Sequence, residues 1–410
     1  MKTPLLATTV VAITALAIYF YPSLEAKPGK TPTIQPPVVT TNVTNPSIIT
    51  PIVQNQKKIE VAFVLDTTGS MSGLIQGAKD NIWSIASSMA SAESAPIIKM
   101  GLVAYRDRGD DYVTKVADLS ADLDTNYGTL MGFQAAGGGD HRESVNKALH
   151  DAVEKLSWSK DQDTYRVIFL VGDAPPQTKY QDEMQFPEIV KLAQSKGIII
   201  NTILCGSDKQ TLSPWKQIAN LGQGEFFQVT QSGNAVAIAT PYDDQIASLS
   251  KQLDNTRLYY GDAHTKEMKR KKTAATELFN SEASAASIAR KAEFNTSKSG
   301  AHNFTGGNEL VNDVMTGQMD LSKIEREQLP EELQALKPEE RTKVVEQKSA
   351  TRKRLQQEIA KLSQQRHAYI KTELAESNAD ENSIDNRIYQ TVRSQASAKG
   401  LVYSSDAPKY

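Results

Sequence analysis

Short apolar runs alternate with longer amphipathic segments between residues 58 and 235. Four of the runs are rich in β-branched residues and almost free of polar positions, as are strands buried on both faces of a sheet. They lie at residues 59–65, 97–105, 166–171 and 198–204. Two weaker runs, at residues 115–119 and 225–229, predict further strands.

Apolar residues recur at helical spacing in the segments that separate these runs. In residues 73–91 one face carries Leu74, Ala78, Ile82, Ile85 and Met89. Further helices are predicted at residues 124–135, 143–156 and 214–221, and around residues 189–194. This alternation is typical of an α/β fold with a doubly wound, mostly parallel sheet and helices on both faces. Ligands bind such sheets at the carboxyl ends of the strands.

The chain changes character after residue 235. A connecting helix is predicted at residues 236–262, and residues 263–410 are charged, poor in aromatic residues and mainly helical in pattern. The longest predicted helix, 339–376, has apolar residues at coiled-coil-like spacing until Arg366 interrupts them, which argues against a long coiled coil. This region either packs on the preceding domain, awaits a partner or is in part disordered.

Smaller features of the same region carry predictions of their own. Residues 297–308 contain Ser, Gly, Asn and Thr, and predict a loop. The basic run at 266–272 is more typical of a solvated helix face than of a binding patch. Residues 384–392 carry an apolar helical stripe, and residues 401–403 have the composition of a short strand.

The N-terminal 26 residues predict export from the cytoplasm. Lys2 precedes an apolar run from residue 5 to 21, which as a helix is about 25 Å long and marginally short for a membrane span. A signal peptide and an uncleaved signal-anchor both fit this pattern. Residues 27–57 are rich in Pro, Thr and Asn and predict an extended linker. We therefore expect a periplasmic or cell-surface protein, with the membrane contacted only through the N-terminal segment, or a secreted one if that segment is cleaved.

Charge and cysteine content exclude several classes of protein. The 46 Lys and Arg residues nearly balance the 48 Asp and Glu residues, for a net charge of −2, so we expect no nucleic-acid partner. Cys205 is the single cysteine, which excludes intramolecular disulfides, cysteine-type zinc sites and iron–sulfur clusters. Its apolar surroundings predict a buried core thiol. No hydrolase elbow, Walker loop, zinc-protease motif or kinase signature set is present.

Oxygen-bearing residues gather directly after the first predicted strand. Asp66, Thr68 and Ser70 stand at positions i, i+2 and i+4 of a tight loop, so that they can face one point, and Gly69 permits the turn. A carboxylate and hydroxyls are hard ligands, suited to Mg²⁺, Mn²⁺ or Ca²⁺ and poorly suited to soft metals. The loop therefore predicts a hard-metal site.

This loop, Asp-Thr-Thr-Gly-Ser-Met, resembles the Asp-x-Ser-x-Ser loop of von Willebrand factor type A domains, with Thr68 in the first hydroxyl position. That family calls the site its metal-ion-dependent adhesion site. Gly-Gly-Gly-Asp-His-Arg-Glu at 137–143 is similar to a variant of the second metal loop, and Val-Gly-Asp-Ala-Pro at 171–175 to the third. The passage from helix to strand at 218–227 and the Tyr-Arg-Asp at 105–107 also match. The resemblance covers residues 58–235.

The resemblance implies a divalent cation, Mg²⁺ foremost and Ca²⁺ or Mn²⁺ otherwise. Its ligands would be Asp66, Thr68, Ser70 and Asp173, with Asp140 or Glu143 completing the set, and Asp173 typically acts through water. Because one coordination position stays open, the family uses the ion to accept a carboxylate from a partner protein. It implies a non-enzymatic binding module, and the C-terminal part is similar to extensions of some bacterial secreted members.

Two other functions compete with cation-dependent docking. A structural scaffold would bind through the C-terminal helices, and a metal-dependent hydrolase would need a general base beside the ion, for which Asp140, Glu143 or His141 could serve. A surface or loop-stabilising role fits His141 better, since a nitrogen donor suits a hard-metal site poorly. Arg108-Gly109-Asp110 spells an integrin-recognition tripeptide, which chance alone can produce. Asp107, Asp110 and Asp111 predict a solvated loop near the rim of the metal site.

Overall fold

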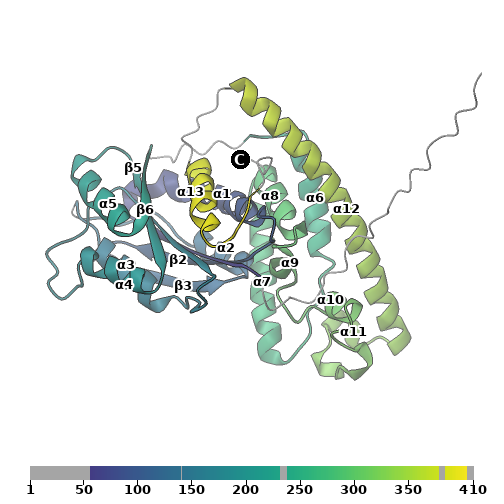
Figure 1. Cartoon of the computed structure of the whole chain (residues 1–410). Coiled ribbons are helices and arrows are strands. Elements are labelled where there is room, and N and C mark those ends of the chain that lie inside the picture. Colours follow the sequence, from purple (N-terminus) through teal and green to yellow (C-terminus); the bar gives the residue numbers. More distant parts are fainter. Residues whose placement is uncertain (1–55, 140, 231–237, 378–383, 404–410) are drawn as a thin grey trace, which may run out of the picture. The chain divides into compact units, whose positions relative to one another are not determined.

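The computed structural model describes residues 56–139, 141–230, 238–377 and 384–403 (Figure 1). The predicted export segment and most of the linker lie outside the described residues, as does Asp140. Within these ranges no helix is both long enough and apolar enough to cross a membrane.

A six-stranded sheet forms the centre of the first half of the chain, and each of its strands was predicted to within a few residues. The strands are β1 (Lys58–Asp66), β2 (Ile97–Tyr105), β3 (Thr114–Ser120), β4 (Tyr165–Gly172), β5 (Ile198–Cys205) and β6 (Gln223–Val229). They run in the order β3-β2-β1-β4-β5-β6, and all pairs are parallel except β2 with β3. The predicted doubly wound, mostly parallel fold is confirmed.

Helices cover both faces of this sheet. One face packs against α3 (Val145–Lys155), α4 (Phe186–Ser195) and α5 (Lys209–Leu221), and the other against α1 (Ser72–Ala90) and α2 (Leu123–Met131). Alternate side chains of β1 enter the two cores, with Val61 and Phe63 on the α1 side and Ala62 and Val64 on the α3 side. This two-sided burial explains why the strand is apolar almost throughout.

Two helix boundaries differ from the prediction. Helix α5 begins five residues before Pro214, the residue that the pattern placed at the helix start. The Asp208 carboxylate caps the true start by accepting a hydrogen bond from the Thr211 amide at 2.7 Å. Helix α2 ends at Met131, short of the predicted residue 135, and the chain then turns through Gly132.

The second half of the chain is helical, as predicted. Its longer helices are α6 (Asp243–Asp254), α7 (Ala263–Glu282), α8 (Ala285–Thr296) and α12 (Pro338–Ser377), and its short ones are α9 (Ala301–Thr305), α10 (Leu310–Met315) and α11 (Glu331–Gln334). The loop prediction for residues 297–308 is wrong at α9, because Phe304 turns inward into a core with α6, α8 and α12. The seam of α12, with Leu355 and Ile359, packs against that same core.

The last helix, α13 (Ile384–Ser397), returns to the sheet that began the chain (Figure 1). It contacts α1 and β6, and buries Ile388, Tyr389 and Val392 in the core on the α1 side of the sheet. Beyond it, Leu401 joins the same core and Tyr403 forms a β-bridge with Ala92. The helices from α6 to α12 therefore occur in the sequence between two parts of one packed α/β layer.

Hydrogen bonds fix α13 on the sheet. The side-chain amide of Gln395 accepts from the Tyr165 hydroxyl of β4 at 2.8 Å and donates to Asn201 Oδ1 of β5 at 2.8 Å. The Glu93 amide donates to the Val402 carbonyl at 2.9 Å. These bonds join α13 and the segment after it to the sheet and to the loop that follows α1.

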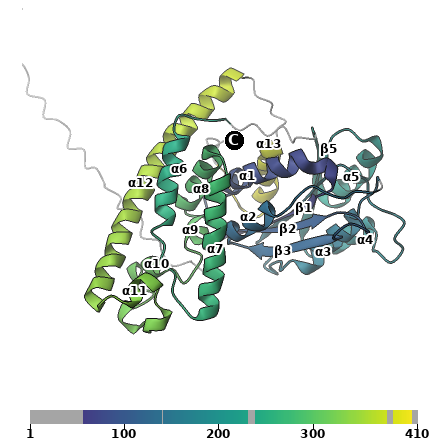
Figure 2. The same cartoon turned by 180° about the vertical axis from the view of Figure 1, so that it is seen from behind.

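Helices α7 and α8 pack on α1 and α2 (Figure 2). Aromatic residues and buried charges form this contact. Trp83 of α1 lies 5.8 Å from the rings of both Phe279 and Phe294. At the crossing of α2 and α7, a Cβ on Gly128 would come within 3.1 Å of the Ala275 side chain. Glycine therefore permits the close approach of these two helices.

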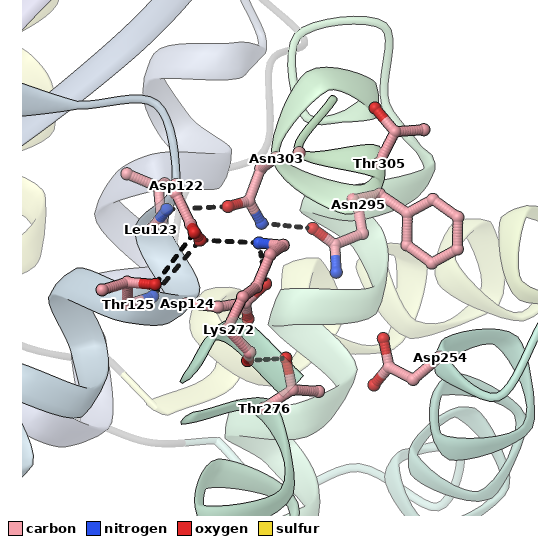
Figure 3. A network of polar contacts seen from close by, with 12 residues as sticks. Asp122, Leu123, Asp124, Thr125, Asp254, Lys272, Thr276, Asn295, Asn303 and Thr305 are labelled. Atoms are coloured by element: carbon pink, nitrogen blue, oxygen red, sulfur yellow. Dashed lines mark hydrogen bonds and ion pairs between the residues drawn. The ribbon is translucent and has the colours of Figure 1, made fainter. Parts of the chain in front are cut away.

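Beside the aromatic residues, a buried ionic network centres on Asp124 of α2 (Figure 3). Its carboxylate lies 2.7 Å from Lys272 Nζ of α7 and 2.9 Å from Lys291 Nζ of α8, and all three side chains are at most 1% exposed. Burial acts to raise the pKa of Asp124, but Lys272, Lys291 and Arg257 outweigh burial and hold that pKa well below its usual value.

The basic run at 266–272 is therefore only in part the solvated helix face that was predicted. Lys272 is buried in the network, where its Nζ also lies 2.6 Å from Asp122 Oδ1. Lys266 donates to the carbonyls of Glu327 and Leu329, and Lys269 donates to that of Gly306. Three cations of the run thus secure neighbouring segments, because their partners come from distant parts of the sequence.

Candidate metal centre

The oxygen-rich loops meet at the carboxyl end of the central strands. Asp66 is the last residue of β1, and Asp173 directly follows β4, its neighbour in the sheet. After β1 the chain passes to α1 on one face, and after β4 it passes to α4 on the other. A sheet opens a crevice where its connections diverge in this way, which is the usual place for a ligand.

Asp66 is held by the loop that follows it. Its Oδ1 accepts hydrogen bonds from the Thr68 amide at 2.9 Å and the Thr68 hydroxyl at 2.7 Å, and that hydroxyl lies 3.4 Å from Ser70 Oγ. Its Oδ2 is buried and has no hydrogen-bond partner among the described residues. A buried carboxylate oxygen without a partner is costly unless something positive lies beside it.

Burial changes the acidity of this carboxyl group. It raises the pKa of Asp66 to about 7, with a further upward contribution from Asp173, although the bonds from Thr68 and the charge of Arg106 oppose the shift. The side chain is completely inaccessible to solvent. The positive charge and the hydrogen bonds beside Asp66 are therefore too weak to offset the effect of burial on the pKa of this carboxyl group.

A cavity of about 340 Å³ opens beside these residues. Its wall includes the predicted ligands Thr68, Ser70, Glu143 and Asp173, together with Gly69, Gly137, Gly138, His141, Ala174, Cys205, Ser207 and Asp208. Glu143 is 3% exposed, and a Cβ on Gly138 would lie 3.7 Å from its Oε1 and 3.5 Å from Thr68 Cβ. The structure thus brings Glu143 into the same cavity as the hydroxyl ligands, whereas Asp140 lies outside the described residues.

The chemistry of the wall fits a hard cation. The predicted ligands in the wall supply two carboxylates and two hydroxyls, and Asp66, which precedes the loop with Thr68 and Ser70, adds a buried carboxylate oxygen without a hydrogen-bond partner among the described residues. Such oxygen donors are the ligands that Mg²⁺, Mn²⁺ and Ca²⁺ prefer. Among the described residues no three His, Cys, Asp or Glu side chains are grouped closely enough to hold an ion by themselves. A site here would therefore depend on the hydroxyls of Thr68 and Ser70.

The remaining candidates have plain structural roles. His141 is 53% exposed at its side chain, and its Nε2 lies 3.4 Å from Asp208. Cys205 is 1% exposed, as predicted for a core thiol, and burial raises its pKa. In the Arg108-Gly109-Asp110 tripeptide, Arg108 pairs with Asp182 and Glu183, while Asp110 accepts from the Gly138 amide.

One part of the rim prediction is wrong. Asp107 is not in a solvated loop but is 5% exposed, because its carboxylate accepts hydrogen bonds from Ser144 and Tyr180. Asp107 comes two residues after the end of β2, at the same edge of the sheet as Asp66 and Asp173. The sequence signal for a role of Asp107 at the site was its position shortly after a predicted strand. The acidic residues Asp110 and Asp111 nearby instead made the segment look like a solvated loop.

Asp66→Asn is expected to stabilise the cation-free protein at neutral and alkaline pH, by roughly 1–3 kcal/mol. The pKa of Asp66 is higher in the fold than in the unfolded chain, so the wild type loses stability as the pH rises from about 4 through about 7. The asparagine side chain does not ionise, so the variant does not lose stability in this way as the pH rises. Urea unfolding in EDTA at pH 4.5 and pH 8 checks this, and an advantage that did not grow with pH would contradict it.

The α/β layer is similar to a known protein family. Residues 60–240 match the family model described as von Willebrand factor A domain. These residues are therefore similar to von Willebrand factor A domains, and we call them the A domain. Domains of this family commonly mediate protein interactions and are in general not enzymes, and many are extracellular. The A domain thus accounts for the six-stranded sheet and the loops at its carboxyl edge.

Individual relatives are distant from this chain. An ariadne-like RING finger protein of Acanthamoeba polyphaga mimivirus is 24% identical over 155 residues, which cover 38% of this chain and 14% of that protein. The mussel byssus proximal thread matrix protein 1, in a structure with a zinc-occupied MIDAS motif, is 14% identical and has a TM-score of 0.33. That match covers 43% of this chain and 42% of the mussel chain. The SpRpn10 VWA domain is 13% identical with a TM-score of 0.33, over 43% of this chain and 89% of its own.

Proposed function

We propose that the A domain is an extracytoplasmic binding module that docks a carboxylate of a partner protein through a divalent cation. The cation would be held by Asp66, Thr68, Ser70 and Asp173, with Glu143 as the further acid and Mg²⁺ as the first choice of metal. When bound, it would supply a positive charge with a coordination position open to the partner. The observation that carries the proposal is the buried, partnerless Oδ2 of Asp66 beside the cavity.

The proposed ligands would contribute to cation binding in different ways. Asp66 would supply negative charge to a cation beside its Oδ2, and its Oδ1 accepts the hydrogen bond that holds the Thr68 hydroxyl in place. Ser70 lies in the turn Gly69–Met71 that opens α1, so its hydroxyl is presented by the end of a helix. Glu143 enters from the start of α3 on the other face, where its amide donates to the Pro175 carbonyl at 3.2 Å. The ligands thus come from both layers of helices and from the sheet.

The scaffold alternative is less well supported. A scaffold that binds through the C-terminal helices needs faces that the protein itself does not use. In the structure, α8 is buried along most of its length, and α12 directs Arg366 onto Asp243 at 2.8 Å and Arg352 onto Glu309 at 2.8 Å. These helices are part of the folded body, so we propose that they support the A domain.

Titration calorimetry of the full chain tests the site. After dialysis against EDTA and removal of the chelator, MgCl₂, MnCl₂ and CaCl₂ are each expected to bind saturably to the wild type. Asp66→Ala is expected to abolish that binding because it removes the central carboxylate. Asp161→Ala is the matched control, since it removes an acid before β4, at the opposite end of the sheet, where it pairs with Lys58.

The partner chemistry needs a second readout. Peptides displayed on phage and selected in Mg²⁺ are expected to share an Asp or Glu that cannot be replaced by Asn or Gln, and to be released by EDTA. Wild-type protein that binds no cation would contradict the site, and cation binding with peptide capture that is indifferent to EDTA would contradict the docking mechanism.

A further inference from the structure

The structure assigns to Asp107 the role of a positioning residue for the metal centre: we propose that its carboxylate joins the second and third metal loops, while Arg106 beside it holds the first. This inference rests on the proposed function, because it concerns how the same cavity keeps its shape. The residues concerned, Asp107 and Arg106, would contact neither the cation nor the partner.

Both oxygens of Asp107 are engaged by the two loops. Oδ1 accepts a hydrogen bond from the Ser144 hydroxyl at 2.6 Å, and Ser144 directly follows Glu143. Oδ2 accepts from the Tyr180 hydroxyl at 2.9 Å and from Gln177 Nε2 at 3.4 Å, both in the loop that begins at Asp173. One buried carboxylate therefore spans the segments that carry two proposed ligands.

The adjacent Arg106 holds the first loop in the same way. Arg106 is 5% exposed. Its guanidinium donates from Nε to the Thr67 carbonyl at 3.1 Å and from Nη2 to the Gln134 carbonyl at 2.8 Å. Thr67 lies between Asp66 and Thr68, and Gln134 leads into the Gly-Gly-Gly segment. The Tyr112 ring covers the guanidinium at 4.5 Å.

The turn that follows these residues supports the glycine segment. Asp110 accepts from the Gly138 amide through both carboxylate oxygens, at 3.2 and 3.3 Å, and also from the Asp107 amide at 3.2 Å. Gly137 has φ of +76°, and a Cβ there would lie 2.2 Å from Asp110 Oδ1. Glycine at 137 therefore lets the second loop lie directly on the turn that begins at Asp107.

Loss of this carboxylate is expected to affect cation affinity more than folding. Groups that orient metal ligands typically contribute about 10- to 100-fold to metal affinity. Asp107→Ala in the full chain is thus expected to bind MgCl₂ and MnCl₂ about 10- to 100-fold more weakly than the wild type. Asp107→Asn should retain most of the affinity, because the amide oxygen can still accept from Tyr180 and Gln177 while the Ser144 hydroxyl accepts from the amide NH2.

Asp151→Ala is the matched control. Asp151 is also a buried carboxylate with multiple bonds, to Thr114 at 2.7 Å, Lys147 at 2.6 Å and Lys155 at 2.9 Å, but it bonds none of the metal loops. Its loss should lower the unfolding temperature and leave cation affinity at the wild-type value. Titration calorimetry and thermal unfolding of each variant separate the two effects.

The outcomes distinguish this inference from the proposed function. Wild type that binds no cation overturns both, whereas wild-type affinity in Asp107→Ala, or equal loss in Asp151→Ala, overturns only the positioning role. If Asp107→Ala does not fold, Tyr180→Phe decides, since it removes a single hydroxyl and is expected to weaken binding about tenfold. Unchanged affinity in folded Tyr180→Phe would then overturn the inference.

Discussion

A chain that ends at residue 383 is expected to lose the cooperative unfolding transition of the A domain. The deletion removes α13 and the segment after it, and with them the buried side chains of Ile388, Tyr389, Val392, Ala396, Leu401 and Tyr403. Each large apolar side chain contributes about 1.5–3 kcal/mol by burial, and domains have net stabilities of only about 5–15 kcal/mol. Loss of the set should therefore exceed the stability available.

Circular dichroism melting and binding of a hydrophobic dye measure this effect. A chain that ends at residue 403 is the control, because it keeps every residue named above and should melt like the wild type. A finer version compares Tyr389→Ala, expected to cost roughly 3–5 kcal/mol, with Val402→Ala, which is 56% exposed and should be nearly neutral. A chain ending at residue 383 that melted at the wild-type temperature would show that α13 is dispensable.

Asp124→Ala is expected to lower the free energy of unfolding by roughly 3–5 kcal/mol. The substitution leaves the ammonium groups of Lys272 and Lys291 buried without their shared partner. Removing one member of a buried ion pair is expensive because the other charge stays desolvated. Urea unfolding at pH 7 measures the change, and Glu358→Ala, which breaks an exposed pair with Arg354, should cost under about 0.5 kcal/mol.

A paired substitution tests this explanation. In Asp124→Leu with Lys291→Met, one negative and one positive charge are removed together, while Lys272 keeps Asp122 and Arg257 keeps Asp254. The double variant should therefore lose less stability than the sum of its single variants. Simple additivity would mean that the charges do not interact as the distances imply.

The Asp124 carboxylate also makes the free energy of unfolding depend on pH in the acidic range. Its pKa in the fold is below the value in the unfolded chain, so its contribution is complete above about pH 4 and is lost as the pH falls toward the folded value. The stability difference between wild type and Asp124→Ala should shrink accordingly between pH 4 and pH 2. A difference that stayed constant in this range would place the effect of the substitution in packing and not in charge.

Much of the sheet and of the metal loops could be predicted from local sequence. Strands buried on both faces have an unmistakable composition, and Asp66 ends one of them while Asp173 directly follows another. Since carboxyl ends of parallel strands meet at one edge, both residues were expected at the same edge, and the pairing of β1 with β4 makes them neighbours. The predicted ligands Thr68, Ser70 and Glu143 do line one cavity with Asp173.

The features that were missed depend on contacts between distant segments. Lys272 belongs to a run of like charges, and only the approach of α2 turns it into a buried cation. The stripe of α13 was visible, but periodicity indicates that a helix has an apolar face and not which surface that face covers. Asp107 looked like one of several acids in a polar turn, and its burial depends on Ser144 and Tyr180.

The long stretch of chain between β6 and α13 has a consequence for how the protein is made. Residues 230–383 separate β6 from α13, and synthesis at about 5–20 residues per second takes on the order of ten seconds to traverse them. Throughout that interval one face of the nascent sheet lacks the part of its cover that α13 supplies, so the core on the α1 side stays incomplete. A sheet that waits for a helix translated so much later stays available to chaperones until α13 has been made.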